Sequence, residues 1–221
     1  MYARISKKRS FYTMRILFYG DSITDAGRAR DVDMASYKLG HTYVTYAAGK
    51  LLERDPVGYE IYNRGISGNR IVDLYSRIKK DCWNLKPDVI SILIGINDIW
   101  HEIGGENGVE LERFETVYRM LLSDTKKALP NVKFILCEPF VLSGSATEEN
   151  FDRFLEVKEY AKVVKKLAEE FDAELVLLQD KFDELGAKYG NDTLLLDGVH
   201  PSLAGGVVLA NEWLKAFDKL N

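Results

Sequence analysis

Five short runs of apolar residues along the chain predict β-strands. The third run is apolar at nearly every position, which is typical of a strand that is covered on both faces. The runs lie at residues 15–19, 60–63, 88–94, 133–137 and 174–178.

Apolar residues at intervals of three and four predict helices between these strands. Strand and helix alternate throughout, so we expect an α/β fold: a parallel sheet with helices on both sides, joined by right-handed crossovers. The predicted helices lie at residues 42–53, 71–82, 111–122, 160–171 and 203–220.

Length and composition indicate a single globular domain. The chain has 221 residues, and 46% of them are hydrophobic, enough for a sizeable core. We expect the domain to span residues 14–221, because residues 1–13 form a basic, polar tail. Cys82 and Cys137 lie in apolar runs and are interpreted as two buried thiols.

Charge and hydropathy limit the partners that we expect. The net charge is −4 and residues 7–9 form the longest basic tract, which argues against a nucleic-acid partner. Residues 1–13 have no apolar run of the length that a secretory signal needs, and no stretch of the chain is long enough to span a bilayer. We therefore expect a cytoplasmic protein with neither nucleic acid nor membrane as a partner.

The loop after the first strand carries a candidate nucleophile. In an α/β sheet, ligands bind beyond the carboxyl ends of the strands. Ser22 lies there, in Gly-Asp-Ser-Ile-Thr. A serine so placed can attack a carbonyl while its own N–H helps to hold the oxyanion. A helix N-cap or a phosphate cradle explains the same residues equally well.

Asp197 and His200 form a second candidate, in Asp-Gly-Val-His-Pro. Three residues apart, they can meet in a turn, where the carboxylate orients the imidazole and stabilises its cation. The ordinary histidine pKa of about 6.5 suits a general base near neutrality. A surface histidine held by a local aspartate is the alternative.

Two further loops offer hydrogen-bond donors for an oxyanion. Asn97 follows the most apolar strand, and Gly65 follows the second strand. An amide side chain and a glycine N–H can both stabilise a developing negative charge, although both residue types are also common in turns. Neither Ser22 nor Ser67 lies in the Gly-x-Ser-x-Gly elbow of α/β-hydrolases.

These motifs together resemble the SGNH hydrolases, also called the GDSL esterases. The resemblance covers residues 14–218, and its one departure is Ile23 where the short family name has Leu. The four marker residues of the family fall, in order, on Ser22, Gly65, Asn97 and His200, and the partner acid falls on Asp197.

The resemblance implies a fold, a mechanism and a set of partners. It implies a flavodoxin-like, three-layer α/β/α sandwich with five parallel strands. It implies that no metal or cofactor is needed, and that the protein is a homo-oligomer. It also implies a triad of Ser22, His200 and Asp197, with an oxyanion hole from the N–H of Ser22, the N–H of Gly65 and the amide of Asn97.

The residues that flank these motifs resemble those of bacterial carbohydrate esterases that remove acetyl groups from xylan-derived sugars. An oligosaccharide ester is therefore the expected substrate. Trp100, His101 and Phe140 are candidate substrate contacts, although Trp100 also suits the core. Arg28, in the loop after Ser22, is a further candidate, and a solvated arginine is the alternative for it.

Two other functions fit part of the pattern. A lysophospholipase or thioesterase of the same family would share the triad and differ in its acyl pocket. A non-catalytic, flavodoxin-like binding module would use residues 20–24 and 65–69 to hold a phosphate or sugar. The binding module leaves Asn97, Asp197 and His200 without a role.

Overall fold

A five-stranded parallel sheet forms the centre of the molecule, as predicted. The computed structural model describes residues 13–31 and 35–220. The expected tail, residues 1–13, lies outside the described residues apart from Thr13. The sheet has the order β2-β1-β3-β4-β5, and every pairing is parallel. The strands are β1 (Met14–Gly20), β2 (Tyr59–Asn63), β3 (Val89–Leu93), β4 (Lys133–Cys137) and β5 (Glu174–Val176).

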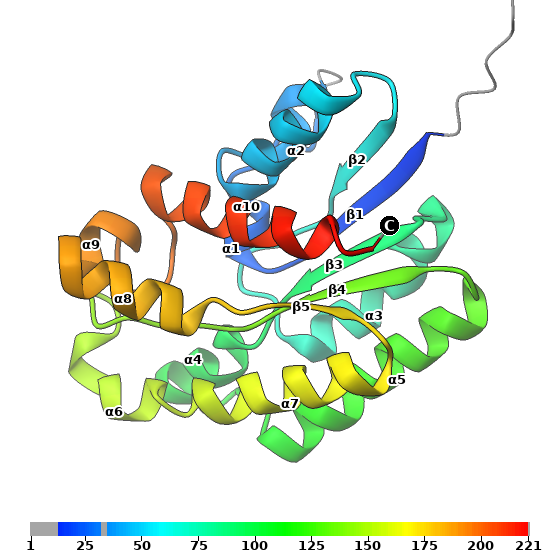
Figure 1. Cartoon of the computed structure of the whole chain (residues 1–221). Coiled ribbons are helices and arrows are strands. Elements are labelled where there is room, and N and C mark those ends of the chain that lie inside the picture. The colour runs from blue at the N-terminus through cyan, green and yellow to red at the C-terminus, as the bar shows by residue number, and fades with distance from the viewer. Residues whose placement is uncertain (1–12, 32–34, 221) are drawn as a thin grey trace, which may run out of the picture.

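Helices cover both faces of this sheet, which confirms the three-layer α/β/α fold (Figure 1). On one face α2 (Tyr43–Arg54) packs against α10 (Leu203–Phe217). On the other face α5 (Leu111–Ala128) packs against both α3 (Ile71–Asp81) and α7 (Val157–Glu170). The remaining helices are α1 (Ser22–Asp25), α4 (Ile96–Gly105), α6 (Phe151–Phe154), α8 (Gln179–Tyr189) and α9 (Asn191–Leu194), with 3-10 turns at Ala35–Leu39, Trp83–Leu85 and Glu148–Asn150.

The last strand and the helix after it differ from the sequence prediction. The strand β5 has three residues instead of the predicted five, because the chain turns at Leu177 into α8. Glu138 holds this turn, since its carboxylate accepts the N–H groups of Leu178 and Gln179. The helix α8 was not predicted, and only Phe182 and Gly186 of its residues are buried, too few to give a helical period.

The core is continuous across the sheet and includes hydrogen-bonded polar groups, as Trp213 illustrates. Trp213 of α10 is fully buried against Phe18, with ring centroids 4.8 Å apart. Its indole N–H donates to Ser91 of β3 over 2.9 Å, so both buried polar groups are satisfied. Cys82 and Cys137 are buried free thiols, as expected, and burial raises the pKa of both to about 12.

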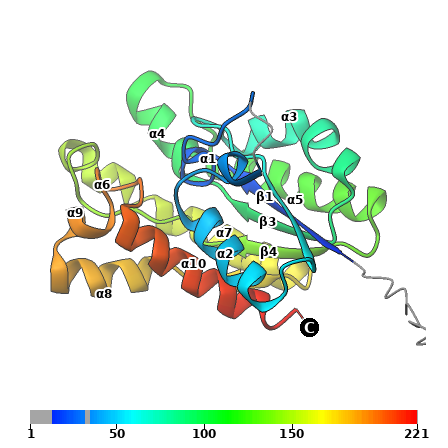
Figure 2. The same ribbon diagram turned by 90° about the horizontal axis from the view of Figure 1, so that it is seen from above.

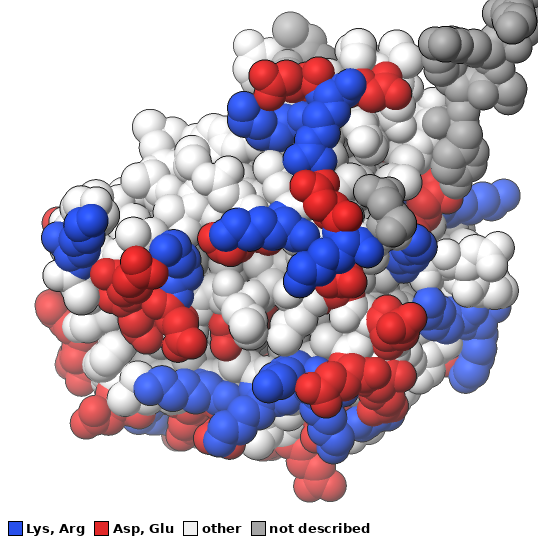
Figure 3. All heavy atoms as spheres, viewed as in Figure 1, with Lys and Arg blue, Asp and Glu red and all other residues white. Residues whose placement is uncertain are grey.

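The surface carries interspersed charges. On the face in Figure 3, Lys and Arg alternate with Asp and Glu, with no extended field of one sign. Several of these charges form ion pairs along or between helices, such as the pair of Arg119 with Glu115 and Glu170. Among the helices of the described residues, none combines the length and the apolar character that crossing a membrane requires.

Beyond the carboxyl ends of the strands, the chain gathers short helices and loops. Seen from above, α1, α4 and α9 lie at this end of the sheet (Figure 2). The loop from α9 to α10 is anchored here by Gly205, where a Cβ atom would collide with the carbonyl of Leu194. Close backbone packing therefore fixes the entry of the chain into α10.

This packing predicts opposite effects for two Gly→Ala substitutions. We expect Gly205→Ala to lower the free energy of unfolding by about 1–3 kcal/mol, because the added methyl overpacks the loop. Gly49→Ala is the matched control: Gly49 lies exposed within α2 with open space at its Cβ position. We expect the control to raise stability by about 0.5–1 kcal/mol. Denaturant unfolding measures both, and equal stability of the two variants would contradict the packing.

Candidate active site

The turn between β1 and α1 presents Ser22 beyond the end of its strand. Asp21 caps the helical turn, and its Oδ1 accepts the N–H of Ile23 over 2.9 Å. Gly20 is required here because a Cβ atom would collide with the carbonyl of Leu93 on the neighbouring strand. The hydroxyl of Ser22 is half-buried, so it is held in place and remains within reach of solvent.

His200 and Asp197 meet Ser22 from the other end of the chain. The Oγ of Ser22 lies 2.9 Å from Nε2 of His200. On the far side of the ring, Nδ1 lies 2.7 Å from Oδ2 of Asp197. The other carboxylate oxygen of Asp197 accepts the backbone N–H groups of Val199 and His200. The three side chains form one continuous hydrogen-bonded row.

The loop that carries this pair is fixed on both sides. Leu195 and Pro201 form an antiparallel bridge across its base. At its tip Gly198 has a positive φ of 99°, and its carbonyl accepts the N–H of Leu142 over 2.9 Å. A Cβ atom at Gly198 would also collide with Thr147. The orientation of the imidazole is therefore set by backbone contacts as well as by Asp197.

The two titratable groups of the loop stabilise each other's charged form. Partial burial raises the pKa of Asp197, but bonds from the His200 ring and from two backbone N–H groups outweigh it and lower the pKa to about 2. The bond to Asp197 raises the pKa of His200 above its ordinary value of 6.5, against the opposing effect of burial. Asp197 is thus a carboxylate at neutral pH, poised to stabilise an imidazolium.

Gly65 and Asn97 lie in neighbouring loops at the same end of the sheet. Gly65 packs directly on the nucleophile turn, since a Cβ atom there would collide with the backbone of Asp25. Its N–H donates to Oδ1 of Asn63 over 2.8 Å. Asn97 is the second residue of α4, is 6% exposed, and donates one amide hydrogen to the carbonyl of Asn69 over 3.1 Å.

Two buried aspartates beside the site were not singled out from the sequence. Asp21 and Asp98 are fully buried, and each has a carboxylate oxygen without a partner among the described residues. Burial raises the pKa of Asp21 to about 7, and burial also raises the pKa of Asp98. Asp21 directly precedes Ser22 and Asp98 directly follows Asn97, but no local pattern in the sequence reveals their burial.

The four candidate substrate contacts have different environments. Phe140 was expected to line the crevice, and this is wrong: it is fully buried against Phe182, with ring centroids 4.5 Å apart. The alternative of a solvated Arg28 is also wrong, because Arg28 is 8% exposed and its Nε donates to the carbonyl of Gly65 over 2.9 Å.

Trp100 and His101 remain accessible on α4. The ring of Trp100 is partly buried edge-on against Phe154, and its centroid lies 6.1 Å from that of His200. It therefore packs on the core and faces the site at the same time. His101 is half-buried, with its Nε2 toward Gly68.

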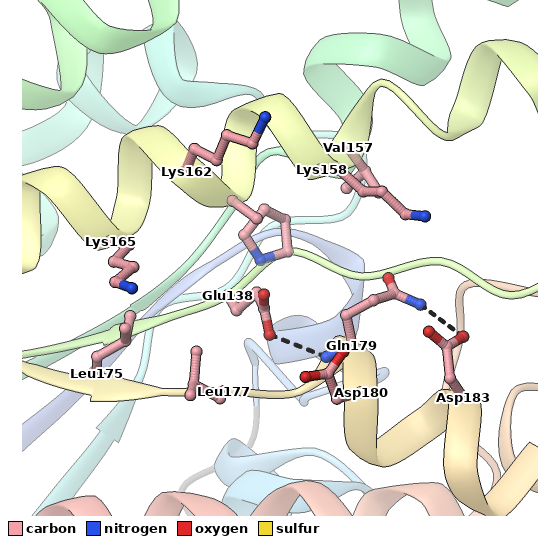
Figure 4. Close-up of a pocket in the computed structure, with 12 residues that line it drawn as sticks. Glu138, Val157, Lys158, Lys162, Lys165, Leu175, Leu177, Gln179, Asp180 and Asp183 are labelled. Carbon is pink, nitrogen blue, oxygen red and sulfur yellow. Dashed lines mark hydrogen bonds between the residues drawn. The ribbon is translucent and has the colours of Figure 1, made fainter.

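A separate cavity of about 330 Å³ opens between α7 and the segment from β5 to α8 (Figure 4). Lysines of α7, among them Lys162, lie across it from Glu138 and Asp180. Ser22, Asp197 and His200 do not line it, and its lining residues include no hydroxyl or thiol group. The hydrogen-bonded row of the strand ends is thus a different place from this cavity.

Comparisons with known proteins place the chain among the GDSL-like ester hydrolases. A family model described as the GDSL-like Lipase/Acylhydrolase family matches residues 18–206. The chain belongs to this family and is a carboxylic ester hydrolase, which confirms the resemblance seen in the sequence.

The chain is similar to individual esterases over nearly its whole length. The acetylxylan esterase of Geobacillus stearothermophilus is 38% identical over 207 residues, which are 91% of this chain and 92% of that protein. The crystal structure of Axe2, an acetylxylan esterase from the same organism, has a TM-score of 0.82 to this chain. The match covers 93% of this chain and 95% of the Axe2 chain. A GDSL-like lipase from Parabacteroides merdae is 41% identical in sequence, and its structure has a TM-score of 0.87. This match covers 94% of this chain and 96% of that protein.

The contact with Asp197 predicts the titration of the His200 ring. We expect its midpoint to lie above 6.5, because the carboxylate favours the imidazolium. Asp197→Asn should lower the midpoint, since the charge and the acceptor are both lost. The nitrogen-15 NMR shifts of the ring measure this. The chain has three histidines, so His41→Gln and His101→Gln assign the signals. A midpoint unchanged by Asp197→Asn would contradict the coupling.

Proposed function

We propose that this chain is a serine esterase that removes acetyl groups from xylan-derived oligosaccharides. Ser22 is the nucleophile, His200 the general base and Asp197 the residue that orients and stabilises the imidazolium. The observation that carries the proposal is the row Ser22–His200–Asp197, with contacts of 2.9 Å and 2.7 Å. Nucleophile, base and orienting acid within hydrogen-bond reach are what this chemistry requires.

The reaction divides into two steps at Ser22. His200 accepts the hydroxyl proton as Oγ attacks the carbonyl carbon, and the resulting imidazolium is stabilised by Asp197. The tetrahedral intermediate collapses, His200 protonates the leaving sugar alcohol, and an acetyl-serine remains. Water, deprotonated by His200, then attacks the acetyl carbon and releases acetate, which restores the serine.

Three donors serve the oxyanion in this proposal. Ser22 is the first residue of α1, where a backbone N–H has no acceptor within the helix. The amide of Asn97 has a second hydrogen beyond the one bonded to Asn69. The N–H of Gly65 is bonded to Asn63, so it acts by sharing its hydrogen between Asn63 and the oxyanion. Removal of one such donor costs about 3–4 kcal/mol of transition-state stabilisation.

The substrate class is proposed from the relatives and from the setting of the site. The acetylxylan esterase of G. stearothermophilus matches nearly the whole chain. Ser22 and His200 are both half-exposed, which suits a bulky alcohol that stays largely outside. Phe140 cannot line a pocket for a long acyl chain, because its side chain is fully buried in the core. Trp100, beside His200, offers an aromatic edge to a sugar ring.

The first test is acetate release from acetylated xylo-oligosaccharides. We expect release by the wild type, and we expect Ser22→Ala to lower turnover on the order of a million-fold, because the attacking oxygen is lost. Simple aryl esters of increasing acyl length are assayed beside it. We expect acetyl esters to be cleaved fastest.

Each outcome of this test has a definite meaning. Activity of Ser22→Ala equal to wild type would exclude the proposed nucleophile. Cleavage of aryl acetates without release from the oligosaccharide would exclude the sugar substrate and leave the triad. A preference for long acyl chains would favour the lysophospholipase or thioesterase alternative.

The oxyanion assignment gives a second prediction. We expect Asn97→Ala to lower kcat by about 100- to 1,000-fold with little change in KM, because the lost bond forms only as charge develops. Asn211→Ala removes an exposed amide from α10 and should leave kcat within about twofold. Steady-state kinetics on an aryl acetate compare the two. An Asn97→Ala enzyme with wild-type kcat would exclude the amide as a donor.

A further inference from the structure

Arg77 of α3 connects the end of β1 with the loop between β2 and α3, and it does not belong to the triad. Its side chain is 14% exposed. The guanidinium donates from Nη1 to the carbonyl of Arg64 over 2.8 Å, and from Nη2 to the carbonyl of Gly20 over 3.3 Å. Its Nε donates to Oδ1 of Asn69 over 2.8 Å. One cation therefore binds the end of β1 and the loop after β2 at three separate acceptors.

Each acceptor is linked to one of the proposed oxyanion donors. The carbonyl of Arg64 belongs to the same peptide unit as the N–H of Gly65. The carbonyl of Gly20 lies two residues before Ser22. The third acceptor is the side chain of Asn69, whose backbone carbonyl holds the amide of Asn97 over 3.1 Å. Movement of Arg77 would therefore be transmitted to all three donors.

The guanidinium itself is firmly held. Asp81, one helical turn further along α3, accepts from Nη1 over 2.9 Å. The ring of Tyr19 lies beneath the guanidinium, with 4.4 Å between its centroid and the Cζ atom. The hydroxyl of Tyr19 in turn donates to the carbonyl of Leu74 on α3 over 2.6 Å. The stacking on Tyr19 and the ion pair with Asp81 together fix the orientation of the Arg77 guanidinium.

We propose that Arg77 is a positioning residue that sets the geometry of the oxyanion hole. It acts through the peptide of Gly65, the nucleophile turn and Asn69, and it touches no reacting atom. The inference rests on the proposed function, since it assigns a role within that oxyanion hole. A charged donor on the carbonyl of Arg64 also polarises the Arg64–Gly65 peptide, which makes its N–H a better donor to an oxyanion.

Arginine is needed at this position for its shape. A lysine keeps the charge, but its compact ammonium cannot reach three separate acceptors in the way that the planar guanidinium does. The donors would then be placed less accurately, and a displacement of about 1 Å can cost on the order of 100-fold in rate. Ground-state binding of the ester does not depend on this placement, so KM should change little.

The test compares Arg77→Lys with two controls on an aryl acetate. We expect Arg77→Lys to lower kcat by about 10- to 100-fold, with KM within about threefold. An aryl boronic acid, which forms a tetrahedral adduct with serine, should lose affinity by a similar factor. Asp81→Asn removes the charge of the ion pair but keeps an amide oxygen that can accept from Nη1, so the guanidinium keeps its orientation and its contacts with Gly20, Arg64 and Asn69. Arg119→Lys is the second control, because Arg119 of α5 pairs with Glu115 and Glu170, and neither partner belongs to these segments. Both controls should keep kcat within about threefold.

Two results would overturn the proposal. One is wild-type kcat and boronate affinity in Arg77→Lys. The other is an equal loss in Asp81→Asn, which would mean that the ion pair within α3 is what matters. Thermal unfolding shows whether each variant is folded.

A second variant keeps the test decisive if Arg77→Lys does not fold. Asn69→Ala removes the acceptor of Nε and should lower kcat several-fold at unchanged KM. Wild-type kcat in Asn69→Ala would then reject the proposal. Loss of activity in Ser22→Ala, measured in parallel, tests the proposed function separately, so failure of the Arg77 proposal leaves the triad standing.

Discussion

The site depends on how closely the loops at the strand ends approach one another. Gly20 lies against the carbonyl of Leu93, and Gly65 lies against the backbone of Asp25, so neither position has room for a Cβ atom. The parallel order β2-β1-β3 places these loops side by side. Backbone packed on backbone leaves little freedom of movement, and this rigidity holds hydrogen-bond donors in place before any charge develops.

The charged side chains around this rigid centre have separate roles. Asp197 is accessible, accepts three hydrogen bonds and stays ionised, while the enclosed Asp21 has its pKa raised by burial. Two carboxyl groups near the same histidine therefore differ in environment, and only Asp197 bonds to its ring. Arg77 and Arg28 hold the carbonyls of the Gly65 loop from two sides. Cations thus support the loop, and an anion supports the imidazole.

Membership of the GDSL-like family determines the class of reaction, which is ester hydrolysis. The substrate depends on the side chains that surround the site. The acetylxylan esterase of G. stearothermophilus matches nearly the whole chain at 38% identity. The proposed specificity depends on features that fold class alone does not determine: the accessible ring of Trp100 and the burial of Phe140. In the proposed function, these features favour a short acyl group over a long one.

The sequence by itself determined the architecture and the residues of the hydrogen-bonded row. Strand and helix have different apolar periods, which are local properties, and Ser22, Asp197 and His200 lie in short motifs whose order matches one family. The tertiary structure decided the rest. Phe140 and Arg28 are buried, and Arg77 reaches the end of β1 and the loop after β2, because these contacts join segments that meet only in the folded chain. Local patterns record the period of an element, whereas burial and hydrogen-bond partners depend on which loops lie opposite one another.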